Sequence, residues 1–437
     1  MADSKHNQAN TVTRRTAIKA GAGALLASGV PLFWPGEARA DKAKIDAVLN
    51  GAVTSGDVPG VVAAAADDKG VFYEGAFGKR NLVTGTAMTP DTMFWIASMT
   101  KALTSIAAMQ MVEQGKLSLD KPISDVVMEL SAAQVLEGFD AEGKPKLRPP
   151  KRPITLRHLL THTAGFSYDL WNKDIERYMK VANVPGIGTC KLEALKVPMI
   201  ADPGEKWEYG INIDWAGKAV ERVSGMSLDG YMRERIFTPL GMKDTGFILR
   251  PDQQARLASV HARGADGKLS PIEFGMPQAP EFFMGGGALY STGRDYLSFL
   301  RALLGNGKLG TAQILKPETV ALVNKNSMGD LNVTLLKTAQ PDLTNDAEFF
   351  PGMVKKWGLA YMINTQDVPG KRSAGSLAWA GLANTYYWLD PKKKVAGVIL
   401  TQILPFADTK TLQVFGDFEG AVYQNGRPPA AGAAKAG

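Results

Sequence analysis

Apolar side chains recur along this chain at two spacings, and each spacing predicts one kind of element. A repeat of three to four residues predicts amphipathic helices, whereas short apolar runs bounded by turn residues predict strands. Helical spacing begins in residues 41–56, where Ile45, Val48 and Leu49 share one face. The same spacing predicts further helices at residues 99–114, 156–161, 212–224, 228–236, 295–305 and 411–423.

Strand signals lie near both ends of the chain. Residues 60–66 and 71–77, and again 385–390 and 395–400, are apolar runs separated by four-residue turn signals. Each pair predicts a β-hairpin. Because helical segments separate the two pairs, the pattern predicts one sheet interrupted by a helical insertion.

The first 40 residues have the three parts of an export signal. Arg14 and Arg15 stand in a charged segment, an apolar run follows to about Trp34, and Ala-Arg-Ala at 38–40 supplies a cleavage site. The paired arginines resemble the twin-arginine type, so we expect a periplasmic or secreted protein. The alternative, an N-terminal membrane anchor or a basic tail, is disfavoured because the run is short and rich in glycine.

Length and composition limit the organisation of the rest. Of 437 residues, 45% are hydrophobic, which supplies ample core material and excludes disorder over most of the chain. We expect one domain over residues 41–425, with an α/β lobe at about 41–125 and 270–425 and a helical lobe at about 126–269. Residues 426–437 are rich in Pro, Ala and Gly and predict a disordered tail.

Charge and cysteine count exclude several function classes. The net charge is +7, and residues 1–40 hold five Lys/Arg and two Asp/Glu, which leaves 45 against 41, or +4. So small a net charge gives no reason to expect binding to nucleic acid or to anionic membranes. The single cysteine, Cys190, excludes an intrachain disulfide framework and a zinc site built on several thiolates. No segment after residue 40 has 18 consecutive apolar residues, so we expect no stable membrane insertion of the mature chain.

The sharpest chemical signal is the S-x-x-K tetrapeptide from Ser98 to Lys101. Residues three apart share a helix face, so the hydroxyl and the amine can meet. A lysine whose pKa is lowered by burial can then accept the serine proton. The alternative is an N-cap serine beside a surface lysine, which is common for this tetrapeptide alone.

Two later segments supply the context. Tyr209 stands in a loop before a helix start at Asn212 or Asp214, where its hydroxyl can point into a cleft and take part in proton transfer. In Trp379-Ala380-Gly381-Leu382, the glycine lets the backbone pass close to a ligand, and neighbouring amides could bind an oxyanion.

In this order, the elements resemble the serine β-lactamase and penicillin-binding superfamily. Residues 159–165 (Leu-Leu-Thr-His-Thr-Ala-Gly) and 285–292 (Gly-Gly-Gly-Ala-Leu-Tyr-Ser-Thr) resemble its class C and esterase branches, and the resemblance runs from about residue 42 to 425. It implies an α+β fold of the β-lactamase/transpeptidase type, an antiparallel sheet flanked by helices with a mostly helical second lobe. The roles that it implies are Ser98 as nucleophile, Lys101 as its activator, Tyr209 as a partner in proton transfer, and the amides of Ser98 and Leu382, on the last strand, as the oxyanion hole beside Trp379 and Gly381.

Two departures from the class C pattern indicate the branch. Ile211 stands where Y-x-N has its Asn, and Trp379-Ala380-Gly381 stands where K-T-G is found. A lysine there would pair with a β-lactam carboxylate, whereas an ester needs no such anchor. The W-x-G form, with Asp214 five residues past Tyr209, resembles the family VIII carboxylesterases, which hydrolyse short-chain esters. We therefore expect an exported serine hydrolase of the carboxylesterase type that acts on small-molecule esters through an acyl-Ser98 intermediate.

Other readings stay open. A β-lactamase, a D-aminopeptidase or another amidase fits the same scaffold, as does a penicillin- or peptidoglycan-binding protein with little turnover. Either Lys101 or Tyr209 could be the general base, and the sequence does not indicate an oligomeric state.

No cofactor or metal is expected. His158 and His162 are spaced i, i+4 but lack the Glu of a zinc motif. No G-x-S-x-G pentapeptide occurs to carry a Ser-His-Asp triad. Phe166, Tyr168 and Trp171 are expected as walls of an apolar acyl pocket.

Overall fold

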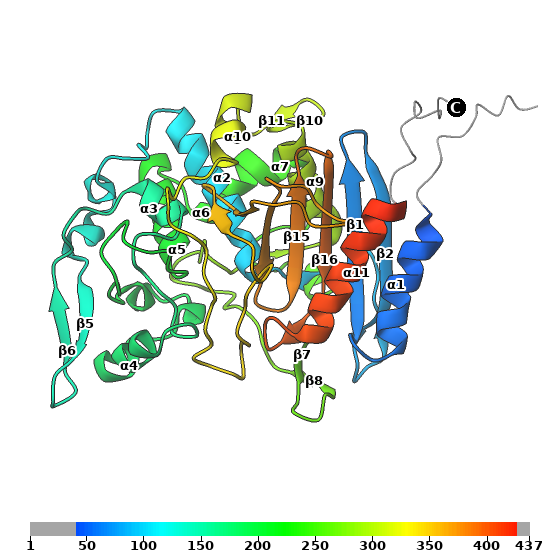
Figure 1. The fold of residues 1–437 in the computed structure, drawn as a ribbon, viewed down its shortest axis with the longest axis horizontal. Coiled ribbons are helices and arrows are strands. Elements are labelled where there is room, and N and C mark those ends of the chain that lie inside the picture. The colour runs from blue at the N-terminus through cyan, green and yellow to red at the C-terminus, as the bar shows by residue number, and fades with distance from the viewer. Residues whose placement is uncertain (1–40, 426–437) are drawn as a thin grey trace, which may run out of the picture. The chain divides into compact units, whose positions relative to one another are not determined.

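The structure is a computed structural model that describes residues 41–425 (Figure 1). The predicted export signal at 1–40 and the predicted tail at 426–437 lie outside the described residues. The centre of the fold is an eight-stranded sheet in the order β12-β13-β14-β15-β16-β1-β2-β3, with every neighbouring pair antiparallel. Its strands are β1 (Gly60–Asp67), β2 (Val71–Asn81), β3 (Thr86–Ala87), β12 (Lys355–Trp357), β13 (Met362–Asn364), β14 (Leu377–Gly381), β15 (Thr385–Asp390) and β16 (Val395–Leu400).

The two ends of the described chain meet in this sheet, as the strand signals predicted. β1 pairs with β16, and Ala64 stands opposite Val398 in the middle of the ladder. Both strands are apolar along nearly their whole length because helices cover both faces. The expected antiparallel α+β architecture is therefore confirmed.

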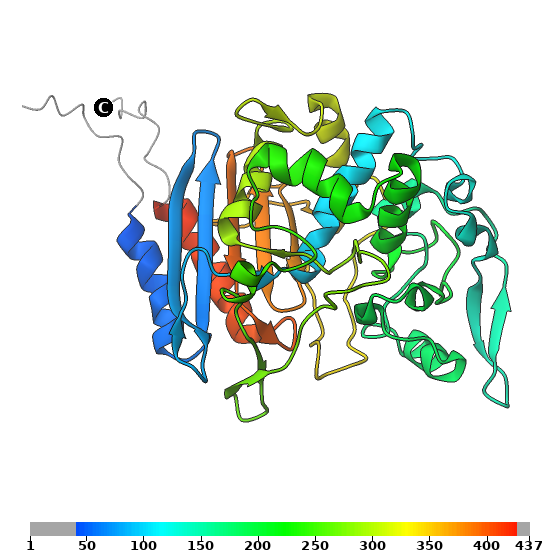
Figure 2. The same cartoon turned by 180° about the vertical axis from the view of Figure 1, so that it is seen from behind.

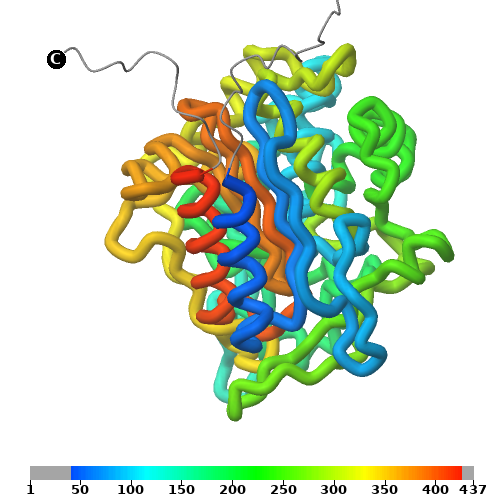
Figure 3. The backbone as a smooth tube through the Cα atoms, turned by 90° about the vertical axis from the view of Figure 1, so that its right-hand side faces the viewer, coloured from blue at the N-terminus to red at the C-terminus, as the bar shows by residue number. Residues whose placement is uncertain are grey.

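Successive residues of β15 show how the faces are covered. Side chains alternate between the two faces of a strand. Trp388 packs against Phe418 of α11 (Thr409–Asn425), whereas its neighbour Tyr387 packs against Tyr296 of α9 (Gly293–Leu304). α1 (Lys42–Thr54) lies beside α11, as the blue and red helices of Figure 3 show. The sheet is thus enclosed by α1 and α11 on one face and by α9 on the other.

Residues between β3 and α9 carry most of the remaining helices. α5 (Asn212–Ser224) and α6 (Leu228–Met232) pack against α2 (Thr100–Glu113), and Figure 2 shows these green helices beside the cyan α2. The stretch also holds two hairpins, so it is not purely helical, and its limits at about 126 and 269 stay a prediction. Its other elements are α3 (Leu156–Leu160), α4 (Lys173–Ala182), α7 (Thr238–Leu240), α8 (Pro251–Gln254), β5 (Val135–Phe139), β6 (Pro145–Arg148), β7 (Val260–Arg263) and β8 (Leu269–Ile272).

Short elements complete the fold. β4 pairs with β9, β10 with β11, and β17 with β7. No helix within residues 41–425 is long and apolar enough to cross a membrane. The bounds of these elements are β4 (Phe94–Trp95), β9 (Tyr290–Ser291), β10 (Lys308–Leu309), β11 (Ala312–Gln313), β17 (Ile403–Leu404) and α10 (Pro317–Val323).

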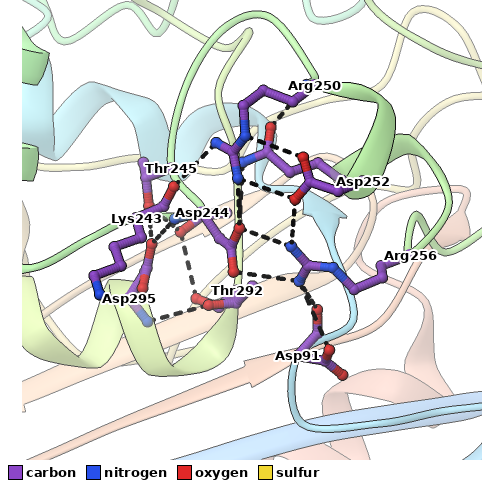
Figure 4. A network of polar contacts seen from close by, with 11 residues as sticks. Asp91, Lys243, Asp244, Thr245, Arg250, Asp252, Arg256, Thr292 and Asp295 are labelled. Atoms are coloured by element: carbon purple, nitrogen blue, oxygen red, sulfur yellow. Dashed lines mark hydrogen bonds and ion pairs between the residues drawn. The ribbon is translucent and has the colours of Figure 1, made fainter.

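An ion-pair network ties the loop after α7 to the start of α9 (Figure 4). Arg256 donates to Asp244 at 2.7 Å. The carboxylate of Asp295 accepts from the backbone N–H of Asp244 at 2.7 Å and from the hydroxyl of Thr245 at 3.0 Å. Asp295 lies in the first turn of α9, where Thr292 caps the helix. The network therefore fixes the end of β9 and, with it, the glycine-rich segment that precedes β9.

Candidate active site

Ser98 lies in a single 3-10 turn, Ala97–Met99, between β4 and α2. The turn places its hydroxyl at the amino end of α2, as the sequence predicted. Ala97 adopts a φ of 44°, in the left-handed region that L-residues seldom occupy. The strained residue before Ser98 allows the chain to reverse direction sharply from β4 into the helix.

Lys101 connects Ser98 to three other segments of the chain. Its Nζ is 3.1 Å from Ser98 Oγ, 3.0 Å from the hydroxyl oxygen of Tyr168 and 2.7 Å from the carbonyl oxygen of Gly286. It also lies over the ring of Tyr209, 4.7 Å from the ring centroid. The residue is only 1% exposed, so Lys101 is buried and is not the surface lysine of the alternative interpretation.

Burial lowers the pKa of Lys101 to about 7, although the nearby Asp214 carboxylate raises it. Asp214 is equally buried, and burial raises its pKa to about 6, against the opposing effect of Lys101. A single glycine links the two: Gly286 donates its N–H to Asp214 Oδ1 at 2.8 Å and accepts the Lys101 bond on its carbonyl. A lysine with such a pKa is a usable base near neutral pH.

Tyr209 lies in the loop before α5, which begins at Asn212, and its ring faces the Lys101 amine. The indole N–H of Trp379 donates to its hydroxyl oxygen at 2.9 Å. Burial raises the pKa of Tyr209, an effect that its hydrogen bonds with Ser98 and Trp379 oppose. The phenol is therefore protonated at neutral pH, which makes Tyr209 a proton donor in the resting site.

The oxyanion segment requires one correction. Trp379 lies within β14, Gly381 ends that strand, and Leu382 follows it. Leu382 was expected on the last strand, but β15, β16 and β17 all come later. Gly381 passes close to the backbone of Ile96, where a Cβ would overlap the Ile96 carbonyl oxygen. Ser98, Gly381 and Leu382 line one cavity.

That cavity has a volume of about 250 Å³ and mostly apolar walls. Tyr168 and Trp171 line it, as expected, and Tyr168 has the further contact with Lys101. Phe166 does not line it: this ring packs behind the site, 6.4 Å from Trp215. The expectation was wrong for Phe166 because its side chain, together with Trp215, lines a different cavity.

The chain is similar in sequence and structure to known proteins. Residues 45–414 match the family model described as Beta-lactamase, which covers most of the chain. The chain belongs to the β-lactamase family. The expected resemblance and fold are thereby confirmed.

Two curated relatives and one solved structure of this family are particularly similar. "Monacolin J acid methylbutanoyltransferase" from Aspergillus terreus is 34% identical over 388 residues, covering 85% of this chain and 93% of the relative. "Lovastatin esterase" from Penicillium rubens is 34% identical over 377 residues, covering 83% and 93%. The unliganded "Simvastatin Synthase (LovD)" from Aspergillus terreus superimposes with a TM-score of 0.75 at 31% identity, covering 87% of this chain and 98% of that one. Relatives of this family member are thus acyltransferases and esterases, which supports ester hydrolysis or acyl transfer by a serine acyl-enzyme.

The two histidines of the possible metal pair have protein partners in this family member. His158 accepts the backbone N–H of Thr155 on Nδ1, within the cap of α3. Nδ1 of His162 is 3.1 Å from the side-chain amide of Asn212. Burial lowers the pKa of His162 well below its usual range, so this ring is neutral beside Tyr209. Among residues 41–425, no three His, Cys, Asp or Glu side chains gather as metal ligands would.

Sequence reasoning missed the contributions of Tyr168, Asp214 and Gly286 to the lysine environment. Asp214 was singled out only as a feature of the W-x-G branch, and Gly286 only as part of a glycine-rich motif. Neither pattern reveals that the two residues meet, because they are 72 positions apart. One feature of the sequence could have indicated this role: Asp214 is an acidic residue on the mostly apolar, buried face of α5.

Proposed function

We propose that this protein is a serine esterase that cleaves short-chain carboxylic esters through an acyl-Ser98 intermediate. The observation that carries the proposal is the buried Lys101 amine, 3.1 Å from Ser98 Oγ, with its pKa lowered to about 7. At neutral pH a large fraction of this amine is unprotonated. It can therefore accept the hydroxyl proton in place of the histidine of other serine hydrolases.

The reaction proceeds in two halves. Ser98 Oγ attacks the ester carbonyl carbon while Lys101 Nζ accepts the hydroxyl proton, and the amides of Ser98 and Leu382 bind the resulting oxyanion. When the carbon–oxygen bond to the alcohol breaks, a proton passes from Lys101, or through the Tyr209 hydroxyl, to the leaving oxygen. Water then attacks the acyl carbon, gives its proton to the same base, and releases the acid and free Ser98.

The walls of the cavity favour a neutral ester over a β-lactam. In the part of the chain that the structure describes, no Lys or Arg lines the cavity, and none of these residues offers a substrate carboxylate a cation to pair with there. Trp379 occupies the place of the K-T-G lysine, and its indole N–H donates a hydrogen bond to the Tyr209 hydroxyl oxygen. The volume of about 250 Å³ suits a short acyl chain.

Hydrolysis of p-nitrophenyl butyrate tests the proposal. We expect turnover by the wild type, a butyrylated Ser98 peptide on rapid quenching, and loss of both in Ser98→Ala. Ser105→Ala is the matched control, because this serine lies in α2 with a buried hydroxyl that has no hydrogen-bond partner among the described residues. Wild-type turnover by Ser98→Ala would overturn the mechanism. Nitrocefin turnover well above ester turnover would favour a β-lactamase, and a stoichiometric acyl burst without steady state would favour a penicillin-binding protein.

Acyl transfer to an alcohol is the second candidate, and the 34% identity to a methylbutanoyltransferase favours it. The acyl-Ser98 carbon would be attacked by an alcohol oxygen in place of water, with the proton again taken by the Lys101 amine. With p-nitrophenyl butyrate and a primary alcohol, the ratio of new ester to butyric acid measures this partition. An ester yield no higher than that of a solution without enzyme would exclude transfer.

We also propose that residues 1–40 direct twin-arginine export. The support is the sequence pattern of paired arginines, apolar run and Ala-Arg-Ala site. Replacing Arg14 and Arg15 with lysines should leave the protein in the cytoplasm of a bacterial host that exports the unchanged chain. Equal export of both forms would contradict the proposal.

A further inference from the structure

The cavity above Ser98 carries an unusual combination of lining groups. Among residues 41–425, seven aromatic side chains line it, Asp169 is the only acidic residue that does so, and no Lys or Arg lines it. Aromatic faces attract cations, and they bind quaternary and protonated amines when a cavity is desolvated. A carboxylate on such a wall adds a full negative charge, which attracts cations as the aromatic faces do.

Neighbouring contacts hold Asp169 at one wall of the cavity. Its Oδ2 accepts a hydrogen bond from Gln340 Nε2 at 3.1 Å, and the adjacent Leu170 carbonyl accepts from Ala339 N at 2.9 Å. Gln340 and Leu343 lie in one turn, and the Leu343 carbonyl accepts from Phe406 N at 2.8 Å. These bonds join the segment after Tyr168 to the long connection between α10 and β12.

Two aromatic rings stand on the same wall. Trp171 lies two residues after Asp169, and its ring meets that of Phe406 edge to face, with centroids 6.2 Å apart. Both line the cavity together with Asp169 and Gln340. Gln340 is uncharged, so its bond orients the carboxylate without neutralising it.

The charges at the floor do not compensate that of Asp169. Lys101 and Asp214 both lie buried there, and their opposite charges offset each other. The cavity as a whole is therefore negative. Opposite unit charges about 4 Å apart near a protein surface attract each other strongly enough to change affinity about tenfold.

We propose that Asp169, Trp171 and Phe406 form a subsite for a positively charged amine, so that esters bearing an ammonium group are preferred over neutral isosteres and anionic analogues. The inference rests on the proposed function, since it assigns the substrate class of that site. The amine would be held by its charge and by the two ring faces, leaving the scissile carbonyl at Ser98.

Competitive inhibition of p-nitrophenyl butyrate turnover tests the subsite with three phenols of similar shape. These are (3-hydroxyphenyl)trimethylammonium, its neutral isostere 3-tert-butylphenol, and 3-hydroxybenzoate. In the wild type we expect the cation to bind about tenfold more tightly than the neutral isostere, and the anion to bind most weakly. In Asp169→Asn, which keeps an acceptor for Gln340, the cation-to-neutral ratio should fall several-fold, and the two aromatic rings should supply the preference that remains.

Asp342→Asn is the matched control, because Asp342 is exposed on the same connection and does not line the cavity. It removes the same charge and should preserve the ratio. Phe406→Leu, a second variant in case Asp169→Asn folds poorly, should weaken cation binding several-fold more than neutral binding. A wild-type ratio near one, or an unchanged ratio in Asp169→Asn, would overturn the subsite. If butyrate ester turnover itself is absent, the proposed function fails separately, and calorimetric affinities of the three phenols still decide the subsite.

Discussion

The indole nitrogen of Trp379 lies 2.9 Å from the phenolic oxygen of Tyr209 and donates a hydrogen bond to it. A neutral donor at this place stabilises the phenol oxygen without the charge that would favour a phenolate. Burial meanwhile raises the pKa of Tyr209 and lowers that of Lys101 to about 7. The two candidate bases thus differ in their surroundings, and the proposed mechanism assigns proton acceptance to Lys101 while Tyr209 remains a phenol.

Trp379→Phe tests this relationship. The substitution keeps an aromatic wall but removes the N–H, and the loss of one buried neutral hydrogen bond costs about 1–1.5 kcal/mol. We expect kcat for p-nitrophenyl butyrate to fall about tenfold while KM changes little. Trp388→Phe is the control, because its indole N–H donates to the Tyr423 hydroxyl at 3.2 Å, on the α11 face of the sheet. It should lower thermal stability and leave kcat unchanged; a matching kcat loss there would point to packing.

The pH profile tests the assignment of the base. Lys101 is active when unprotonated, so activity should be present above its pKa of about 7 and lost as pH falls below it. We expect kcat/KM to show an acid limb centred near pH 7. His162 cannot supply this limb, because burial holds its pKa well below the usual range. A profile that stays flat from pH 8 to about 5 would rule out Lys101 as the base.

Asp214→Asn tests the carboxylate below the lysine. Because Asp214 raises the pKa of Lys101, its replacement should shift the acid limb to lower pH by about one unit, with a lower maximal rate from the weaker base. Asparagine can still accept the Gly286 N–H, so the loop should keep its position. Asp295→Asn removes a buried carboxylate outside the site and should not move the limb. An unmoved limb in Asp214→Asn would show that the carboxylate only supports the loop.

Gly286→Ala tests whether the close packing of Gly286 against Asp214 and Tyr168 is needed for activity. A Cβ at residue 286 would lie 2.6 Å from Asp214 Oδ2 and 2.9 Å from the Tyr168 hydroxyl, so the loop would have to move away from Lys101. We expect activity to fall at least about a hundredfold, since small displacements at a reacting centre have effects of this size. Gly287→Ala is the control, because its Cβ would meet the flexible end of Met284 at 3.0 Å. Comparable losses in both variants would contradict the role of Gly286.

The sequence predicted most of the fold because its long elements have strong periodicity. The helix at 212–224 matches α5 at both ends, and the hairpins around residues 67–70 and 391–394 are present. The strands β12 and β13 were not predicted, since three residues carry no periodicity. The 228–236 helix ends regularly at Met232 and continues as a π turn, Arg233–Phe237, which no sequence pattern indicates.

The site was predicted less completely than the fold. Ser98 and Lys101 are neighbours in sequence, so their spacing alone places them together. Tyr209 and Trp379 were noted as candidates one by one, but their contact could not be predicted from local patterns, because it joins residues 170 positions apart. Long-range contacts such as that of Asp214 with Gly286 depend on how the lobes pack, and local patterns contain no information on it.

Asp295→Asn tests the network at the start of α9 (Figure 4). Burial raises the pKa of Asp295 to about 6, above its unfolded value. The native state therefore binds this proton more tightly, and the free energy of unfolding should fall as pH rises from about 4 to about 6. Relative to the wild type, the variant should gain about 1–3 kcal/mol across this range. Asp252→Asn is the contrasting control: arginine contacts lower the pKa of Asp252, so this variant should lose stability relative to wild type as pH rises. Thermal unfolding at pH 4 and pH 7 measures both differences, and equal shifts in the two variants would contradict the assignment for Asp295.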